Sequence, residues 1–266
     1  MRRFLLLLIS TVLVIRQTGT PSAADLQPHR AVYRMELAGE QRHSEVVSAN
    51  GVMVYRFARV CDGWTVENRT FLRLLYDNDT SSDTLWSFVS WEKLDGTRFR
   101  FHARYDQDGK TIEKLEGQAS LKKPGGPGTA VFAQPEATLA LPPGTVFPTA
   151  HIRDLIAAAT AGKHRLNRTV FDGASEDNPY VVNALFGPLP DAEAEALARP
   201  VQLPVLPAWW TRMAFYPMAS PLSEPEFEMA AHYRADGIAD SIIQQFDTFS
   251  LDVQLRTIEL LPPPDC

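Results

Sequence analysis

The residues best suited to covalent chemistry are the two cysteines, Cys61 and Cys266, and Cys266 is the last residue of the chain. A free thiol at a chain terminus has no packing role, whereas a disulfide back to an early segment would tie down an end that otherwise frays. Such a bridge closes a loop of nearly the whole chain, for which the chain-entropy estimate is about 5 kcal/mol at most. It also requires an oxidising compartment. We therefore predict a Cys61–Cys266 disulfide in an exported protein.

The other chemistry-bearing residues form no familiar catalytic or metal-binding motif. The chain contains no C-x-x-C, H-E-x-x-H, phosphate-loop or G-x-S-x-G sequence. Its six histidines are scattered, without a second histidine or cysteine at metal-ligand spacing. A hydrolase of envelope polymers would need a pair of carboxylates in a cleft, and the 32 acidic residues are too many to nominate one pair. The sequence thus predicts no enzyme, no cofactor and no metal site.

Three residues are candidates for contact with a ligand or a partner: Trp209, Trp210 and Arg30. Adjacent residues of a strand face opposite sides, so at most one of the two tryptophans is buried in a one-sided sheet, and the other is available to a partner. Arg30 has two interpretations, a buried arginine paired with a carboxylate at a strand start or a ligand contact. The five tryptophans as a group either line a cavity or fill the core.

Residues 1–24 have the pattern of a secretory signal peptide. Two arginines precede an apolar run from Phe4 to Ile15, and small residues up to Ala24 fit a cleavage site before Asp25. The run is too short for an ordinary transmembrane helix. Removal of this segment takes away three arginines and leaves 23 basic against 32 acidic residues, a net charge of about −9. This balance argues against nucleic acid as a partner, and we expect the mature chain in the periplasm.

The elements that must position these residues are mainly antiparallel β-strands. Five Asp-Gly pairs and one Asn-Gly pair supply hairpin turns. Most of them are flanked by alternating apolar and polar residues, which indicate half-buried strands. Alternation from Phe246 to Ile258 predicts one long strand with a bulge around Thr248. We expect a single β-rich domain over residues 25–266, closed by the terminal disulfide.

Two short helices interrupt this pattern. The first is expected to begin with Thr149 as its cap, to carry apolar residues at helical spacing from Ile152 to Ala159, and to end at Gly162. A second candidate, Asp191 to Arg199, is short and rich in alanine and glutamate. The stretch from Pro200 to Pro225 is rich in proline and is not expected to be regular throughout.

The chain combines three stretches that are specific as a set: P-H-R-A-V-Y from Pro28, C-D-G-W from Cys61, and L-P-P-G-T-V-F-P-T from Leu141. Together with the terminal cysteine they resemble the EipB-type cell envelope integrity proteins of alphaproteobacteria, from about Leu26 to Cys266. The resemblance implies a mainly β periplasmic protein, folded as a long antiparallel β-spiral or open barrel-like sheet with a Cys61–Cys266 disulfide. It also implies a role in envelope integrity under stress, a periplasmic partner with tetratricopeptide repeats, and no catalytic residues.

Two functions are compatible with these features. The leading hypothesis is a non-catalytic periplasmic protein that supports cell envelope integrity through protein–protein contacts. The alternative is a periplasmic carrier or sensor of a lipid or other apolar ligand, because a curved sheet with one apolar face can enclose a cavity.

Overall fold

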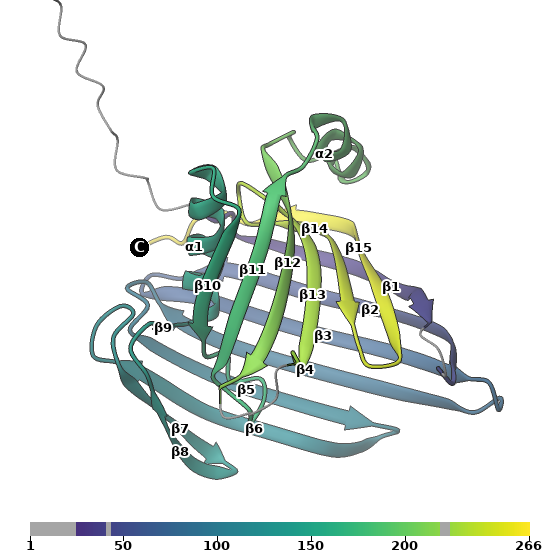
Figure 1. Cartoon of the computed structure of the whole chain (residues 1–266), viewed down its shortest axis with the longest axis horizontal. Helices are drawn as coiled ribbons and strands as arrows, with labels where there is room; N and C mark the ends of the chain where they lie inside the picture. The colour runs from purple at the N-terminus through teal and green to yellow at the C-terminus, as the bar shows by residue number, and fades with distance from the viewer. Residues whose placement is uncertain (1–24, 41–43, 219–223) are drawn as a thin grey trace, which may run out of the picture.

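The computed structural model describes residues 25–40, 44–218 and 224–266 (Figure 1). The predicted signal peptide, residues 1–24, lies outside the described residues. Within them, a single sheet accounts for most of the chain and two α-helices accompany it (Figure 1). Neither of these two helices has the length and apolar character needed to span a membrane.

The described residues contain fifteen strands. They are β1 (His29–Glu40), β2 (Val46–Arg59), β3 (Gly63–Tyr76), β4 (Ser81–Lys93), β5 (Arg98–Gln107), β6 (Lys110–Leu121), β7 (Gly128–Gln134), β8 (Glu136–Leu141), β9 (Thr145–Val146), β10 (Arg165–Val170), β11 (Tyr180–Pro188), β12 (Ala208–Pro217), β13 (Phe227–Arg234), β14 (Ala239–Gln245) and β15 (Phe249–Leu260). The helices are α1 (Pro148–Thr160) and α2 (Asp191–Ala198), and a 3-10 turn, η1 (Arg199–Val201), continues α2.

All of these strands belong to one sheet, in the order β8-β7-β6-β5-β4-β3-β2-β1-β15-β14-β13-β12-β11-β10-β9. Neighbours are antiparallel except for the parallel pair β9 and β10. The outermost strands, β8 and β9, are joined by residues 142–144 alone, so the sheet must curl until its edges approach each other. The result is the barrel-like spiral of Figure 1, in which β10–β13 cross in front of β3–β6. The predicted mainly β, open barrel-like fold is confirmed.

An aromatic cluster connects the two ends of the spiral. Its members are five buried phenylalanines whose ring centroids lie 5.1 to 6.5 Å apart: Phe99, Phe101, Phe132, Phe147 and Phe171. They come from β5, from β7, and from the segments just before α1 and just after β10. Burying such a side chain contributes roughly 1.5–3 kcal/mol. The cluster therefore stabilises the curl that brings distant strands together.

Helix α1 packs against β10 and β11 and fills one end of the curled sheet (Figure 1). The residue before it, Phe147, provides no side-chain cap. Instead, the carboxylate of Glu92 on β4 accepts hydrogen bonds from the backbone N–H groups of Thr149 (2.7 Å) and Ala150 (3.0 Å). The prediction that Thr149 caps the helix is wrong, because a carboxylate from a distant strand satisfies these donors. Gly162, with a φ of 73°, follows the end of the helix, as predicted.

Two further predictions concern the second half of the chain. The long strand expected from Phe246 to Ile258 is confirmed from Phe249 onward as β15, but its start is wrong, because β14 ends at Gln245 and residues 246–248 form a hairpin turn. This turn is closed by a hydrogen bond of 2.9 Å from the Phe246 N–H to the Phe249 carbonyl. The proline-rich stretch begins within the 3-10 turn η1 and is irregular from there to β12, and its prolines stay out of the middle of that strand.

The two ends of the described chain lie in the middle of the sheet, where β1 pairs with both β2 and β15. After β15, residues 261–266 cross to the β2–β3 turn. There Cys266 is joined to Cys61, with 5.7 Å between the two Cα atoms. The structure thus contains the disulfide predicted from the sequence.

Candidate functional site

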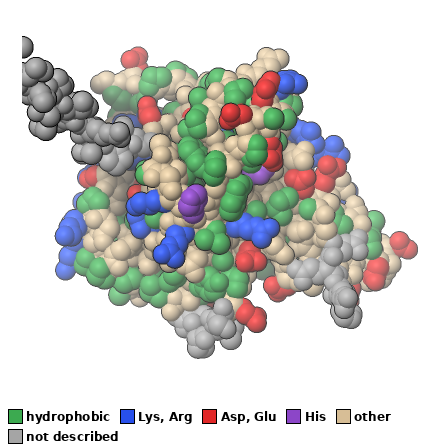
Figure 2. Space-filling view, turned by 45° about the horizontal axis from the view of Figure 1, so that its top comes forward, with side chains coloured by type: hydrophobic (Ala, Val, Ile, Leu, Met, Phe, Trp, Pro, Cys, Tyr) green, Lys and Arg blue, Asp and Glu red, His purple; other side chains and the backbone are tan. Residues whose placement is uncertain are grey.

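The structure offers hollows rather than a catalytic set. Among the residues described, no group of three His, Cys, Asp or Glu side chains is placed to hold a metal ion. The face in Figure 2 mixes basic, acidic and apolar side chains, so no single charge covers it. Three hollows are large enough to receive a ligand or part of a partner. We call them the α1 cleft, the interior cavity and the Trp210 hollow.

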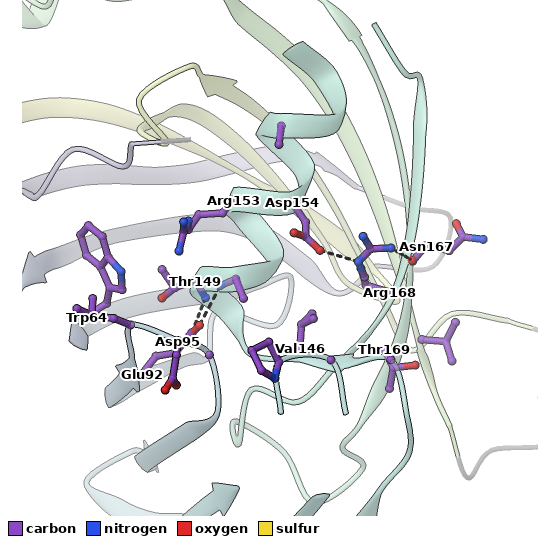
Figure 3. Close-up of a pocket in the computed structure, with 18 residues that line it drawn as sticks. Trp64, Glu92, Asp95, Val146, Thr149, Arg153, Asp154, Asn167, Arg168 and Thr169 are labelled. Carbon is purple, nitrogen blue, oxygen red and sulfur yellow. Dashed lines mark hydrogen bonds and ion pairs between the residues drawn. The ribbon is translucent and has the colours of Figure 1, made fainter. Parts of the chain in front are cut away.

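The α1 cleft has a volume of about 790 Å³ and lies between α1, β10 and the turns at one end of the sheet (Figure 3). Trp64 and Glu92 line one side of it, from β3 and β4, and they stand directly opposite each other in the ladder between these strands. Arg153 projects from α1 on the Trp64 side, whereas Asp154 points toward Arg168 of β10 (Figure 3). The cleft therefore has a deep wall at Trp64 and a more open one at β10.

Most charges in the α1 cleft are already balanced by neighbours. Asp154 accepts a hydrogen bond of 2.7 Å from Arg168, and Asp95 forms a 2.6 Å ion pair with Lys93. The Glu92 carboxyl is buried, and this burial raises its pKa to about 7, although the two N–H groups of α1 and the charge of Arg153 pull the pKa down. Within the described residues, Arg153 itself forms no hydrogen bond or ion pair and acts only electrostatically on Glu92.

The interior cavity has a volume of about 240 Å³ and is enclosed by β1–β3, β13, β14 and the first turn of α1. Its lining is mostly apolar or aromatic and includes Met53, Tyr55 and Ile242. The Tyr33 hydroxyl donates a 2.8 Å hydrogen bond to the Ala239 carbonyl. By contrast, the Tyr55 hydroxyl has no hydrogen-bond partner among the described residues, and burial raises its pKa. The cavity thus combines apolar walls with the hydroxyls of Tyr55 and Tyr233, neither of which has a hydrogen-bond partner among the described residues.

His29, rather than Arg30, faces the inside of the sheet. The His29 ring is 3% exposed, lines the interior cavity and donates from Nδ1 to the Gln27 carbonyl at 2.8 Å. Burial lowers its pKa, so the ring is neutral near pH 7. Arg30 is exposed on the opposite face of β1. The interpretation of Arg30 as a buried arginine paired with a carboxylate is therefore wrong, and its role as a contact residue stays a prediction.

The Trp210 hollow lies on the outer face of β12–β14 and has a volume of about 280 Å³. Trp209 is 8% exposed and belongs to the core, whereas Trp210 is 41% exposed. The indole of Trp210 lies over Gly187 of β11, where an added Cβ atom would come within 2.8 Å of the ring. The exposed guanidinium of Arg212 lines the same hollow and forms no ion pair within the described part of the chain.

A polar pair lies beside the Trp210 hollow, made of the half-buried His232, which lines it, and the buried Asp240, which does not. Nδ1 of His232 lies 3.9 Å from Oδ1 of Asp240, and neither atom has a hydrogen-bond partner among the described residues. Burial raises the pKa of Asp240 to about 6 and lowers that of His232. Because Trp, Arg and His meet on an outer face, this hollow has the composition of a protein-binding hot spot.

The sequence singled out Trp210 and included Trp64 among the tryptophans that line a cavity or fill the core, and Trp64 does both, but it missed the other residues of these hollows. The α1 cleft takes residues from β3, β4, α1, β10 and several turns, and no spacing along the chain connects them. His29 stood next to the candidate Arg30, and the alternation of β1 decides which of the two faces inward.

Comparison with known proteins supplies the remaining evidence. A family model described as EipB-like matches residues 20–262. The cell envelope integrity protein EipB of Brucella abortus (strain 2308) is 36% identical over 163 residues. This match covers 60% of this chain and 57% of the relative, so it spans little more than half of that protein.

A solved structure is similar over a larger share of the chain. It is a β-barrel-like protein of a domain of unknown function from Brucella abortus, with a TM-score of 0.82 and 24% sequence identity. The similarity covers 90% of this chain and all of that one. At this identity the likeness shows the fold, and it agrees with the curled sheet described above.

Proposed function

The chain belongs to the EipB-like family, and we propose that it supports the integrity of the cell envelope without catalysing a reaction. The observation that carries the proposal is the family match, which extends over nearly the whole chain. The relative named as a cell envelope integrity protein, 36% identical in the matched part, supports it. The absence of a recognisable catalytic motif in the sequence is compatible with it.

We place the protein in the periplasm. The pattern of residues 1–24 is that of a cleaved signal peptide. The Cys61–Cys266 disulfide supports the same location, because such bonds persist in oxidising compartments and are rare in the cytosol. A fusion of the first 24 residues to a reporter that is active only after export would test whether these residues direct export to the periplasm. Activity that remains without these residues would refute it.

The mode of action that we propose is contact with another protein through the Trp210 hollow. Trp and Arg side chains carry much of the binding energy in protein interfaces. Trp210 and Arg212 are both exposed, and Arg212 forms no ion pair with any residue that the structure describes. The family resemblance leads us to expect a periplasmic partner with tetratricopeptide repeats. Arg30, on the outer face of β1, is a second candidate contact of this kind.

A genetic experiment tests this function. A strain that lacks the protein should become sensitive to detergent and to antibiotics that act on the cell wall, and the wild-type chain should restore resistance. Trp210→Ala should restore it poorly, whereas Leu260→Ala, which removes another exposed apolar side chain (48% exposed), should restore it fully. Full rescue by Trp210→Ala would exclude the hollow as the contact, and normal resistance of the deletion strain would exclude the function itself.

The second candidate function is the binding of an apolar ligand, and the interior cavity favours it. Its volume of about 240 Å³ lies just below the usual range of small-molecule sites, roughly 300–1,000 Å³, so it suits a short apolar segment rather than a whole lipid. Native mass spectrometry of mature protein from the periplasm tests this. A lipid-sized mass that leaves on denaturation supports the carrier, and a clean apo mass supports the contact function alone.

A further inference from the structure

The deep wall of the α1 cleft contains hydrogen-bond donors that the described protein does not use. Trp64 is 6% exposed, lines the cleft, and its Nε1–H group is buried without a hydrogen-bond partner. The Nε–H group of Arg59 is also buried and unpartnered, and the Arg59 guanidinium carbon lies 5.0 Å from the centroid of the Trp64 ring. Arg153 projects into the same region from α1 (Figure 3). Within the described part of the chain, the donors of Trp64 and Arg153 thus face the cleft without an acceptor, and Arg59 stands beside Trp64 with its Nε–H group unpaired.

Such a cluster is unusual, because buried polar groups in native proteins are nearly always hydrogen-bonded. Each unmet donor carries a desolvation penalty, and the penalty is larger for a charged group. An indole and two guanidinium groups can only donate. The missing partner must therefore be an acceptor, and the two positive charges favour an anion.

The acidic residues of the cleft do not fill this role. Glu92 stands opposite Trp64, but its two oxygens accept the backbone N–H groups at the start of α1. Asp95 is paired with Lys93, and Asp154 with Arg168, on the far side of α1 (Figure 3). Among the described residues that line the cleft, Arg153 is the cation left without an ion pair, and Arg59, beside the Trp64 ring, has none either.

We propose that the α1 cleft binds a phosphate group, held by Trp64 Nε1 and by the guanidinium group of Arg153, while Arg59, which lies over the Trp64 ring, adds a second positive charge. A tetrahedral oxyanion can accept from separate donors on β3 and α1, whereas a planar carboxylate is usually held in a bidentate pair with one arginine. With a volume of about 790 Å³, the cleft also has room for an organic group attached to the phosphate. Asn167 and Thr169 of β10 line the open side, where an uncharged polar body would lie. This site is independent of the proposed envelope function.

Two binding experiments on the mature, oxidised protein test the proposal. Calorimetric titration measures binding of inorganic phosphate and of glycerol phosphate. Flotation measures binding to phosphatidylglycerol vesicles, with phosphatidylcholine vesicles for comparison. Trp64→Phe removes the N–H group and keeps an aromatic ring, and Arg153→Gln removes one charge from the surface of α1. Arg165→Gln is the matched control, because Arg165 is exposed on β10 outside the cleft. We expect each cleft variant to weaken binding about 10-fold or more, and the control to bind like the wild type.

The probes separate the two sources of a phosphate group. Binding of the soluble phosphates with this variant pattern supports a free ligand. Binding that is confined to phosphatidylglycerol vesicles with the same pattern supports a lipid headgroup. The proposal is overturned if no probe binds, if the cleft variants bind like the wild type, or if Arg165→Gln weakens binding as much as they do. Thermal melts accompany each titration, and Arg153→Gln decides the outcome if Trp64→Phe does not fold.

Discussion

Replacing Cys61 and Cys266 together by serine should lower the melting temperature and increase protease sensitivity, because the disulfide constrains almost the entire chain. The two cysteines are separated by 205 positions in the sequence. The segment after β15 is held to the sheet by little else. Its first residue, Leu261, donates a backbone hydrogen bond of 2.8 Å to the Pro28 carbonyl. The disulfide is therefore the main attachment of the C-terminal end.

The size of the effect follows from the length of the closed loop. The chain-entropy relation gives about 5 kcal/mol for a loop of this length, and removal of a native disulfide typically costs about 2–5 kcal/mol. In domains of this size, 1 kcal/mol shifts the melting temperature by roughly 2–4 °C. We therefore expect a decrease of about 5–20 °C. Because the penalty acts through the unfolded chain, far-ultraviolet circular dichroism at 25 °C should stay unchanged.

The assay compares thermal melts of the oxidised wild type, the reduced wild type and the double serine variant, followed by limited proteolysis. The reduced wild type and the variant should melt together, well below the oxidised protein. Addition of reductant to the variant is the control, and it should change nothing. If the oxidised and reduced proteins melt within about 1 °C of each other, the disulfide does not stabilise the fold and the argument from loop closure fails.

Three further predictions follow from single residues. Burial raises the Glu92 pKa from 4.5 to about 7. The stability that protonated Glu92 contributes is therefore lost as the pH rises from 4.5 to about 7, and the loss is about 3 kcal/mol. Urea unfolding of Glu92→Gln should not show this loss. The His151 pKa is lowered to about 4, so the stability that the neutral ring contributes is lost as the pH falls from 6.5 to 4. At pH 4.5, His151→Leu should therefore have lost about 2–3 kcal/mol less stability than the wild type. An equal loss of stability in both proteins would contradict this. Gly173→Ala should lower the folding stability by about 2 kcal/mol or more, because φ at this position is +68° and a Cβ atom would lie 2.4 Å from the Phe101 ring. In the same melts, Gly109→Ala should lower the stability by only about 1 kcal/mol, because φ is +76° there but the space around the added Cβ atom is open.

The strands were predictable because their signals are local. Asp-Gly turns and period-two alternation lie within a few residues of each other, and they suffice to indicate an antiparallel sheet. The same locality explains the error at Phe246, because apolar residues continue on both sides of a turn that contains no glycine. It also explains the error at Thr149. The carboxylate that satisfies the first N–H groups of α1 lies 57 residues earlier, on another strand, beyond any capping pattern.

The placement of candidate site residues was predictable only where the alternation of side chains along a single strand determines which face each residue lies on. Alternation within β12 separates Trp209 from Trp210, and the structure places them on opposite faces, as expected. The α1 cleft could not be anticipated in this way. Trp64 was one of five tryptophans expected to line a cavity or fill the core, but nothing in the sequence connects it with Arg59 or Arg153. What distinguishes these residues is that the described structure supplies them no acceptor.

The disulfide and the α1 cleft are parts of one structural unit. Cys61 lies in the turn between Arg59 and Trp64, and this turn is closed by backbone hydrogen bonds between Val60 and Gly63. Trp64 stands opposite Glu92 in the β3–β4 ladder, and Glu92 holds the start of α1, the helix that carries Arg153. A continuous set of bonds thus connects the terminal disulfide to all three unpartnered donors. Because the turn is closed by backbone hydrogen bonds of its own, reduction of the disulfide should lower the stability of the fold and leave Trp64 in place.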